Sequence, residues 1–108
     1  MATVRWSSRA LRNLSSIRDY WSDNVSEEVA ERLTTEIVEA VGRLSDFPEL
    51  GRVIPELGQR DLREVLSGNY RVPYRLLDGE SVYIVTVVDA RQDFRTVTGV
   101  DTWSVPDA

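Results

Sequence analysis

Three residue types that often supply acid–base chemistry or metal ligands are missing from this 108-residue sequence: cysteine, histidine and lysine. All 13 basic residues are arginine. Without cysteine the chain has neither disulfides nor thiolate ligands for a structural zinc ion. Histidine is the side chain whose ordinary pKa lies near neutrality, and arginine effectively keeps its proton, so a general base would have to be a carboxylate or a tyrosine. The sequence therefore predicts no metal site and no cofactor, and it offers little for acid–base catalysis.

Long hydrophobic runs are missing as well. No stretch is long enough to cross a bilayer, and residues 1–6 lack the apolar run of a signal peptide. The length suits one domain with a modest core. We therefore expect a soluble, cytoplasmic, single-domain protein without a membrane partner, and the absence of cysteine fits such a reducing compartment.

Positive charge is scarce overall, because the net charge is −5. This argues against a general nucleic-acid coat, since phosphate binding needs a positive field. The charge is uneven: residues 26–46 hold six acidic residues and two arginines, whereas residues 48–79 hold five of each. The acidic segment is most simply the solvated face of a helix, and a local arginine patch remains compatible with the second segment.

Two helices are predicted after a short opening strand at Thr3–Trp6. Apolar residues recur at three- and four-residue spacing over residues 10–21 and again over residues 30–44. Ser7 or Ser8 can cap the first helix and Ser26 the second, because a serine hydroxyl accepts an otherwise unpaired amide of the first turn. The polar link between the helices is short, so we expect an antiparallel helical hairpin.

Three strands are predicted in the second half of the chain. Leu62–Ser67 and Tyr70–Leu77 flank Gly68-Asn69, a two-residue turn typical of β-hairpins. Asp78-Gly79 is a second turn signal and leads into Ser81–Val88. The order β-α-α-β-β-β predicts an α+β fold, with the helical hairpin packed on one face of a small, mainly antiparallel sheet.

The first of these turns also fixes a register. It places Val65 opposite Val72, Glu64 opposite Pro73 and Arg63 opposite Tyr74, with Tyr70, Val72 and Tyr74 toward the core and Arg71, Pro73 and Arg75 on the other face. In the last strand both faces are apolar, which is typical of a central strand covered on each side. Since the helices cover one face only, we expect the second face, with Tyr83, Val85 and Val87, to lie open or beneath the C-terminal tail.

Several groups of residues, taken in order, resemble a known superfamily. They are Trp6-Ser7 with Ala10, Leu14, Ile17 and Tyr20; an L-x-x-x-P-x-L-G-R run from Leu44 to Arg52; Leu62-Arg63-Glu64; Tyr70-Arg71-Val72-Pro73-Tyr74-Arg75; and Val85, Val87 and Val88 before Asp89-Ala90-Arg91-Gln92-Asp93. Their order and spacing, from about Thr3 to Arg95, resemble the RelE/ParE superfamily of bacterial toxins. The resemblance implies the toxin of a type II toxin–antitoxin module, with a toxin domain over residues 1–95. Residues 96–108 would then be a C-terminal tail that forms an added strand or an interaction segment.

Members of this superfamily differ in activity, and the departures of this chain from the common pattern bear on the choice. RelE-like members cut messenger RNA on the ribosome with a basic concave face, whereas ParE-like members are known as gyrase poisons without a hydrolytic site. Here Asp89 stands where a histidine is frequent, and Gln92 where a second arginine often lies. The resemblance is therefore nearer to ParE in chemistry.

Cleavage of RNA through its 2′-hydroxyl would need a base, an acid and positive charge at the phosphate. Arg71, Arg75 and Arg91 could hold the phosphate, because a planar guanidinium binds it with two parallel hydrogen bonds. Asp89 or Glu64 could act as a base only with a raised pKa, which neighbouring arginines would lower. A ribonuclease is possible on these residues and is not favoured.

Binding of a target requires no such groups. The residues that we expect to bind partners are Arg71, Arg75, Arg91, Tyr83, Val85, Val87 and Trp103. An exposed apolar face usually marks a binding site, and the C-terminal segment of an antitoxin that folds as it wraps the toxin would fill it. Trp103 would suit an interface anchor if exposed, and it could equally fold back over the sheet.

We therefore expect a ParE-like toxin that acts by binding its target, with DNA gyrase as the family expectation. A cognate antitoxin would neutralise it in a toxin–antitoxin hetero-oligomer. One alternative is a RelE-like, ribosome-dependent mRNA endoribonuclease with Arg71, Arg75 and Arg91 at the phosphate. Another is a non-toxic, degenerate member that serves as an antitoxin-binding module.

Overall fold

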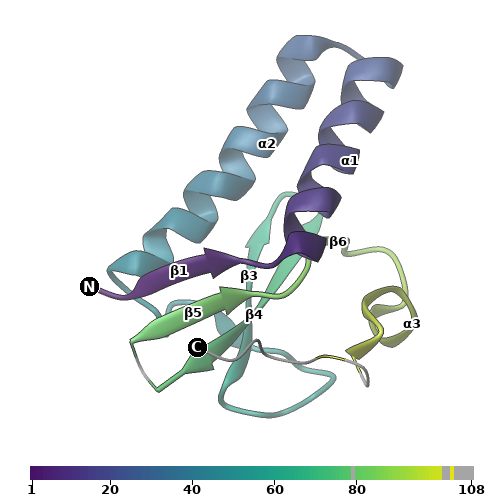
Figure 1. Ribbon diagram of the computed structural model, residues 1–108. Helices are drawn as coiled ribbons and strands as arrows, with labels where there is room; N and C mark the ends of the chain where they lie inside the picture. The colour runs from purple at the N-terminus through teal and green to yellow at the C-terminus, as the bar shows by residue number, and fades with distance from the viewer. Residues whose placement is uncertain (79, 101–102, 104–108) are drawn as a thin grey trace.

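The computed structural model describes residues 1–78, 80–100 and 103. A helical hairpin packs on one face of a small mixed sheet, and a short third helix lies beside β6 (Figure 1). The elements are β1 (Thr3–Trp6), α1 (Ser8–Asn24), α2 (Glu27–Gly42), a 3-10 turn (Arg43–Ser45), β2 (Arg52–Val53), β3 (Leu62–Ser67), β4 (Tyr70–Leu77), β5 (Ser81–Ile84), β6 (Val88–Asp89) and α3 (Phe94–Thr98). The predicted α+β class is confirmed.

Both long helices begin at the predicted caps. The Ser7 hydroxyl accepts a hydrogen bond from the amide of Ala10 at 2.9 Å, and the Ser26 hydroxyl accepts one from the amide of Val29 at 3.1 Å. Each cap satisfies an amide that the first helical turn leaves unpaired. The two helices therefore start at fixed points and lie side by side in opposite directions (Figure 1).

The strand order in the sheet is β1-β5-β4-β3-β2, with β6 also paired to β4. β1 runs parallel to β5, while the other pairs are antiparallel. The predicted hairpin register is confirmed, because Val65 lies opposite Val72 and Arg63 opposite Tyr74. Gly68 has a φ of 56°, the left-handed conformation that its turn requires.

The last predicted strand is interrupted in its middle. β5 ends at Ile84 and β6 begins at Val88. In the gap, the hydroxyl of Ser7 donates a hydrogen bond to the carbonyl of Val85 at 2.7 Å. The side-chain oxygen of Asn13 accepts hydrogen bonds from the hydroxyl of Thr86 and the amide of Val87. One continuous strand was a wrong prediction here, because side chains at and near the start of α1 replace part of the sheet's own hydrogen bonding.

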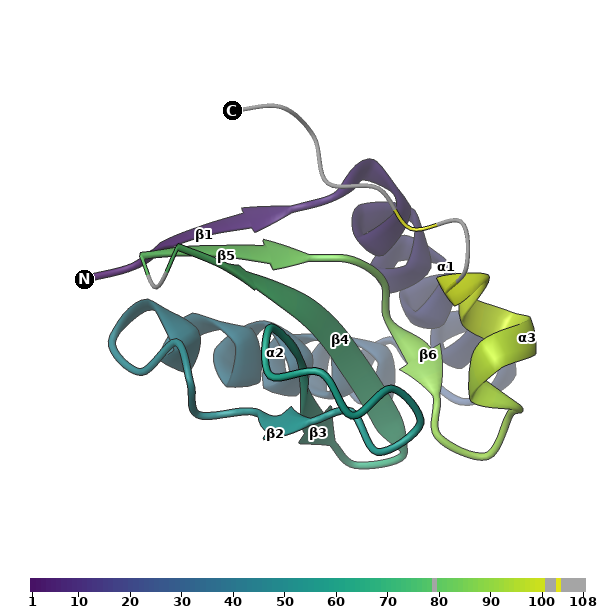
Figure 2. The ribbon, with the colours of Figure 1, turned by 90° about the horizontal axis from the view of Figure 1, so that it is seen from below.

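A second apolar cluster covers the face of the sheet that lies away from the hairpin. Its buried members are Ile54, Leu62 and Phe94, with Leu57 and Trp103 packed against them. Figure 2 shows the loop between β2 and β3 on this side of the sheet and α3 at its end. Of the residues expected on a face that lies open or beneath the tail, Val85 is 8% and Val87 3% exposed, and Val87 packs in the main core with residues of α2.

The C-terminal region begins as a helix and not as an added strand. The carboxylate of Asp93 caps α3 by accepting the amide of Thr96 at 3.0 Å, and Gly99 ends the helix with a φ of 59°. The tail boundary expected after Arg95 falls inside this helix. Residues 101–102 and 104–108 of the expected tail lie outside the described residues. No helix in the described ranges has the length and apolar character needed to cross a membrane.

Candidate functional site

A cleft of about 620 Å³ opens between α1, the 86–88 segment and α3. α1 lines one wall along a single stripe, at spacings of three and four residues. The residues of that stripe are Arg9, Asn13, Ser16 and Tyr20. Tyr70 from β4 and Asp89, Arg91 and Val97 from the β6–α3 region also line the cleft. The cleft therefore joins the N-terminal helix to segments almost a whole chain length away.

Three aromatic side chains, Tyr20, Trp21 and Tyr70, form part of the cleft lining. The indole N–H of Trp21 donates a hydrogen bond to the hydroxyl of Tyr70 at 2.8 Å. The Tyr20 ring meets Trp21 edge to face, with 5.3 Å between the ring centroids. Tyr20 is 57% exposed, so an aromatic surface is presented to solvent beside polar walls. Such a mixed surface suits an interface anchor.

Two arginines and one carboxylate carry the charge of the cleft. The guanidinium of Arg9 donates to the carbonyl of Val97 at 3.0 Å and so links α1 to α3. Arg91 is paired with Asp89 at 2.7 Å. The hydrogen bond from the Arg91 side chain lowers the pKa of the Asp89 carboxyl. The local charge is therefore weakly positive on a protein that is acidic overall.

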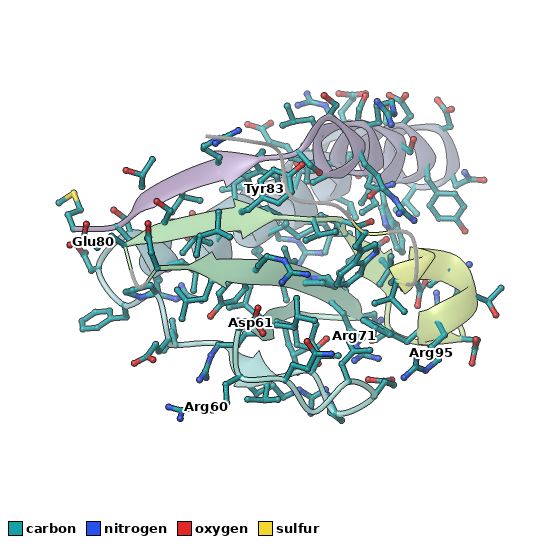
Figure 3. All side chains as sticks on the ribbon, turned by 60° about the horizontal axis from the view of Figure 1, so that its bottom comes forward. Arg60, Asp61, Arg71, Glu80, Tyr83 and Arg95 are labelled. Carbon is teal, nitrogen blue, oxygen red and sulfur yellow. The ribbon has the colours of Figure 1, made fainter. Side chains whose placement is uncertain are left out.

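Arg71 does not belong to this cleft and is buried under α3. Its guanidinium is bonded to Glu64 and to Glu56, each at 2.7 Å, and lies 4.3 Å from the centroid of the Phe94 ring. The Glu64 side chain is fully buried and also pairs with Arg52 at 2.7 Å. Figure 3 shows Arg71 beside α3, close to the labelled Arg95. In this network all three guanidinium nitrogens of Arg71 donate hydrogen bonds to carboxylates, and the bond to Glu56 links the loop before β3 to the sheet.

The other predicted site residues lie apart from one another. Arg75 pairs with Asp61 at 2.9 Å, on the loop that precedes β3. Tyr83 on β5 is half-buried, and the guanidinium of Arg5 lies 5.9 Å from its ring centroid. In Figure 3, Tyr83 lies on β5, away from Arg71. The three arginines named from the sequence thus do not converge on one phosphate-sized site.

Trp103 folds back in the described structure. Its indole N–H donates to the carbonyl of Thr98 at 2.9 Å, and its ring meets Phe94 with 6.2 Å between centroids. It is half-buried against the second apolar cluster. Of the two expectations for this residue, folding back agrees with these contacts, which are with α3 and the second apolar cluster.

The carboxyl groups beside Arg71 and Arg91 have lowered pKa values, which do not suit a general base. The side-chain hydrogen bond from Arg71 lowers the pKa of Glu56 to about 2, and the pKa of Asp89 is lowered in the same way by Arg91. Burial raises the pKa of the Tyr74 hydroxyl, which donates to the carbonyl of Pro48. No cluster of carboxylates that could hold a metal ion occurs among the described residues. Neither Glu56 nor Asp89 therefore has the raised pKa that a general base needs.

Sequence reasoning missed the α1 wall of the cleft. Tyr20 was named from the sequence only as part of the family resemblance, and neither Arg9 nor Trp21 was predicted to bind a partner. The available signal was a second stripe on the first helix, polar and aromatic, at positions 9, 13, 16 and 20. Of the partner-binding residues expected from the sequence, Val87 and Arg91 line the cleft, together with Asp89.

The model of one family, described as ParE toxin of the type II toxin–antitoxin system parDE, matches residues 4–94. "Toxin RelE2" of Caulobacter vibrioides is 38% identical over 88 residues, which is 81% of this chain and 93% of that protein. "Putative toxin Y4kP" of Sinorhizobium fredii is 35% identical over 95 residues, 87% of this chain and 94% of that protein.

Solved structures share the fold. A structure of the chromosomal ParDE system of P. aeruginosa has a TM-score of 0.71 at 22% identity and covers 84% of this chain and 98% of its own. The RelBE2 toxin–antitoxin complex of Mycobacterium tuberculosis has a TM-score of 0.58 at 25% identity. The match covers 82% of this chain and 96% of the chain in that structure. These likenesses support the same arrangement of a helical hairpin on a small sheet.

Proposed function

The chain belongs to the ParE family of type II toxin–antitoxin toxins, within the RelE/ParE superfamily, and from this premise we propose that it poisons its target by binding it. One observation carries the proposal. Each of the three arginines that could have held a scissile phosphate is already paired with a carboxylate: Arg71 with Glu56 and Glu64, Arg75 with Asp61, and Arg91 with Asp89.

The carboxylates in two of these pairs also argue against hydrolysis. A general base at neutral pH needs a pKa raised toward 7. Hydrogen bonds from Arg71 and Arg91 instead lower the pKa of Glu56 and of Asp89. Both groups therefore stay ionised and bonded, which suits a fixed recognition surface.

We assign target binding to the cleft lined by Arg9, Tyr20, Tyr70 and Arg91. It combines an exposed aromatic ring with guanidinium groups, the side-chain types that dominate binding energy at protein interfaces. The expected target is DNA gyrase, in keeping with the ParE resemblance. A cognate antitoxin is the expected neutralising partner, because the family is one of toxins that are paired with antitoxins.

Expression of the chain without an antitoxin tests the proposal. We expect growth arrest with DNA breaks that depend on gyrase, and we expect Tyr20→Ala and Arg91→Ala to reduce toxicity at least tenfold at equal protein level. The matched control is Arg60→Ala, which removes an exposed arginine from the loop before β3. Full toxicity of both cleft variants would refute the assignment of the cleft.

A second candidate function is favoured by one comparison. The relative from Caulobacter vibrioides is called RelE2, and RelE-like chemistry would give codon-positioned cuts in messenger RNA with no gyrase-linked breaks. Sequencing of RNA ends from the same cultures distinguishes the two. Normal growth at a confirmed protein level would instead favour the non-toxic, antitoxin-binding module.

A further inference from the structure

The helical hairpin carries an apolar groove on the face that is turned away from the sheet. The groove measures about 460 Å³ and lies between α1 and α2. Two large apolar side chains stand in it, and both are half exposed: Leu11 at 52% and Val38 at 47%. Small residues, among them Ser15 and Thr35, lie between the two helices there, so that another helix could approach closely.

The residues of this face can be matched level by level along the two helices. At the closed end of the hairpin, the hydroxyl of Ser22 donates a hydrogen bond to Glu27, and Arg18 lies 4.0 Å from the same carboxylate. Because the helices are antiparallel and each rises by about 1.5 Å per residue, each step back along α1 is matched by a step forward along α2. The matched levels are Arg18 with Glu31, Ser15 with Thr35, and Leu11 with Val38. We call these six residues the outer hairpin face.

Each level of the outer hairpin face therefore holds a complementary pair: opposite charges, two small residues, or two apolar residues. We propose that the occupant of this face is a second copy of the chain, in a dimer whose two-fold axis runs parallel to the helices. That axis places α1 of one copy over α2 of the other and keeps every residue at its own level. Leu11 then meets the partner's Val38, and Arg18 meets the partner's Glu31, twice each by symmetry.

Charged residues on the solvent-exposed side of the two helices support a two-fold axis parallel to the helices. Arg12 on α1 lies about level with Glu39 on α2, and Asp19 lies about level with Arg32, and all four are exposed. Stacking α1 on the partner's α2 thus brings opposite charges together at both points. A two-fold axis perpendicular to the helices would instead reverse the order of residues along the partner's helix. It would place the apolar Leu11 against the charged Arg18 of the partner subunit, and a charge buried against an apolar side chain is unfavourable. Charge pattern and apolar pattern select one geometry.

Sedimentation equilibrium of the purified full chain over a range of concentrations tests the dimer. We expect reversible association with a Kd on the order of 1–100 µM, since a face of two short helices is small for a protein interface. Arg18→Glu and Glu31→Arg should each weaken association by roughly tenfold or more, because each places two like-charged pairs at the interface. The double variant Arg18→Glu/Glu31→Arg restores the pairs and should recover association. Circular dichroism checks that every variant is folded.

The matched control is Arg60→Glu, a reversal of the same charge on a loop remote from the helices (Figure 3), which should leave the Kd unchanged. A chain that remains monomeric at all concentrations would overturn the dimer, as would a double variant that stays as weak as the single ones. Occupation of this face by an antitoxin segment, with the free toxin monomeric, would overturn it too. None of these outcomes bears on the proposed toxicity, which is assigned to the cleft on the other side of α1.

Discussion

At the scale of single residues, Gly51 has no room for a side chain. Its amide donates to the hydroxyl of Tyr74 at 3.0 Å. A Cβ at this position would lie 2.6 Å from the backbone oxygen of Glu64 and 2.6 Å from a ring carbon of Tyr74. The structure therefore requires a glycine here for the close approach of the loop to a buried ring.

We therefore expect Gly51→Ala to lower the free energy of unfolding by about 1–3 kcal/mol, the usual cost of overpacking a rigid site. Urea denaturation followed by tryptophan fluorescence measures it. Gly42→Ala is the matched control, because a Cβ there meets nothing within 4 Å and alanine favours a helix, so that variant should gain up to about 1 kcal/mol. Equal stability of the two variants would contradict the close-approach argument.

The ion pair of Glu56 with Arg71 makes stability depend on pH. The bond to Arg71 lowers the pKa of Glu56 from 4.5 to about 2 in the folded state. Its contribution is therefore complete above pH 4.5 and is lost as the pH falls from about 4.5 toward about 2. The Glu56 side chain is 35% exposed, so solvent screening limits the contribution to on the order of 1–2 kcal/mol.

Glu56→Gln should consequently be less stable than the natural chain at neutral pH, and the gap should close as the pH falls through that window. Urea unfolding at a series of pH values between 7 and 2.5 gives both curves. Two curves that stay parallel over the whole range would show that the pair adds no pH-dependent stability.

At the scale of elements, local signals predicted the hairpins and missed the segments that depend on tertiary contacts. Serine caps and the Gly68-Asn69 turn act within a few residues, so the starts of α1 and α2 and the β3–β4 register could be predicted. The division of the last strand could not, because it depends on Asn13, more than seventy residues away. The partner of Arg71 was missed for the same reason: Glu56 reaches it from a loop without any periodic pattern.

The division between β5 and β6 leads to a prediction for the cleft. Asn13→Ala would leave the hydroxyl of Thr86 and the amide of Val87 without their acceptor at 2.6 and 3.1 Å. We expect a loss of about 1–3 kcal/mol, the cost of unsatisfied buried polar groups, and faster amide hydrogen exchange at Val87. Ser16→Ala, an exposed change on the same wall of the cleft, is the control and should leave exchange at Val87 unaltered. Unchanged exchange in Asn13→Ala would show that α1 does not hold this segment.

At the scale of the whole molecule, the sheet is covered by apolar clusters on both faces. The hairpin covers one face with the main core, and Ile54, Leu62 and Phe94 cover the other. The sequence predicted the first layer from helical periodicity. It could not predict the second, which is assembled from a loop, a five-residue helix and Trp103.

Net charge and ion pairing together predict weak binding to free nucleic acid. The chain carries a net charge of −5, and Arg52, Arg71, Arg75 and Arg91 are already paired with carboxylates. We expect a Kd weaker than about 100 µM for a 20-nucleotide single-stranded RNA at 150 mM salt, because few counterions would be released. Fluorescence anisotropy over 50–200 mM salt measures it. A micromolar Kd that weakens steeply with salt would mean that the pairs open to admit phosphate, and it would shift the argument from a toxin that binds a protein toward one that acts on RNA.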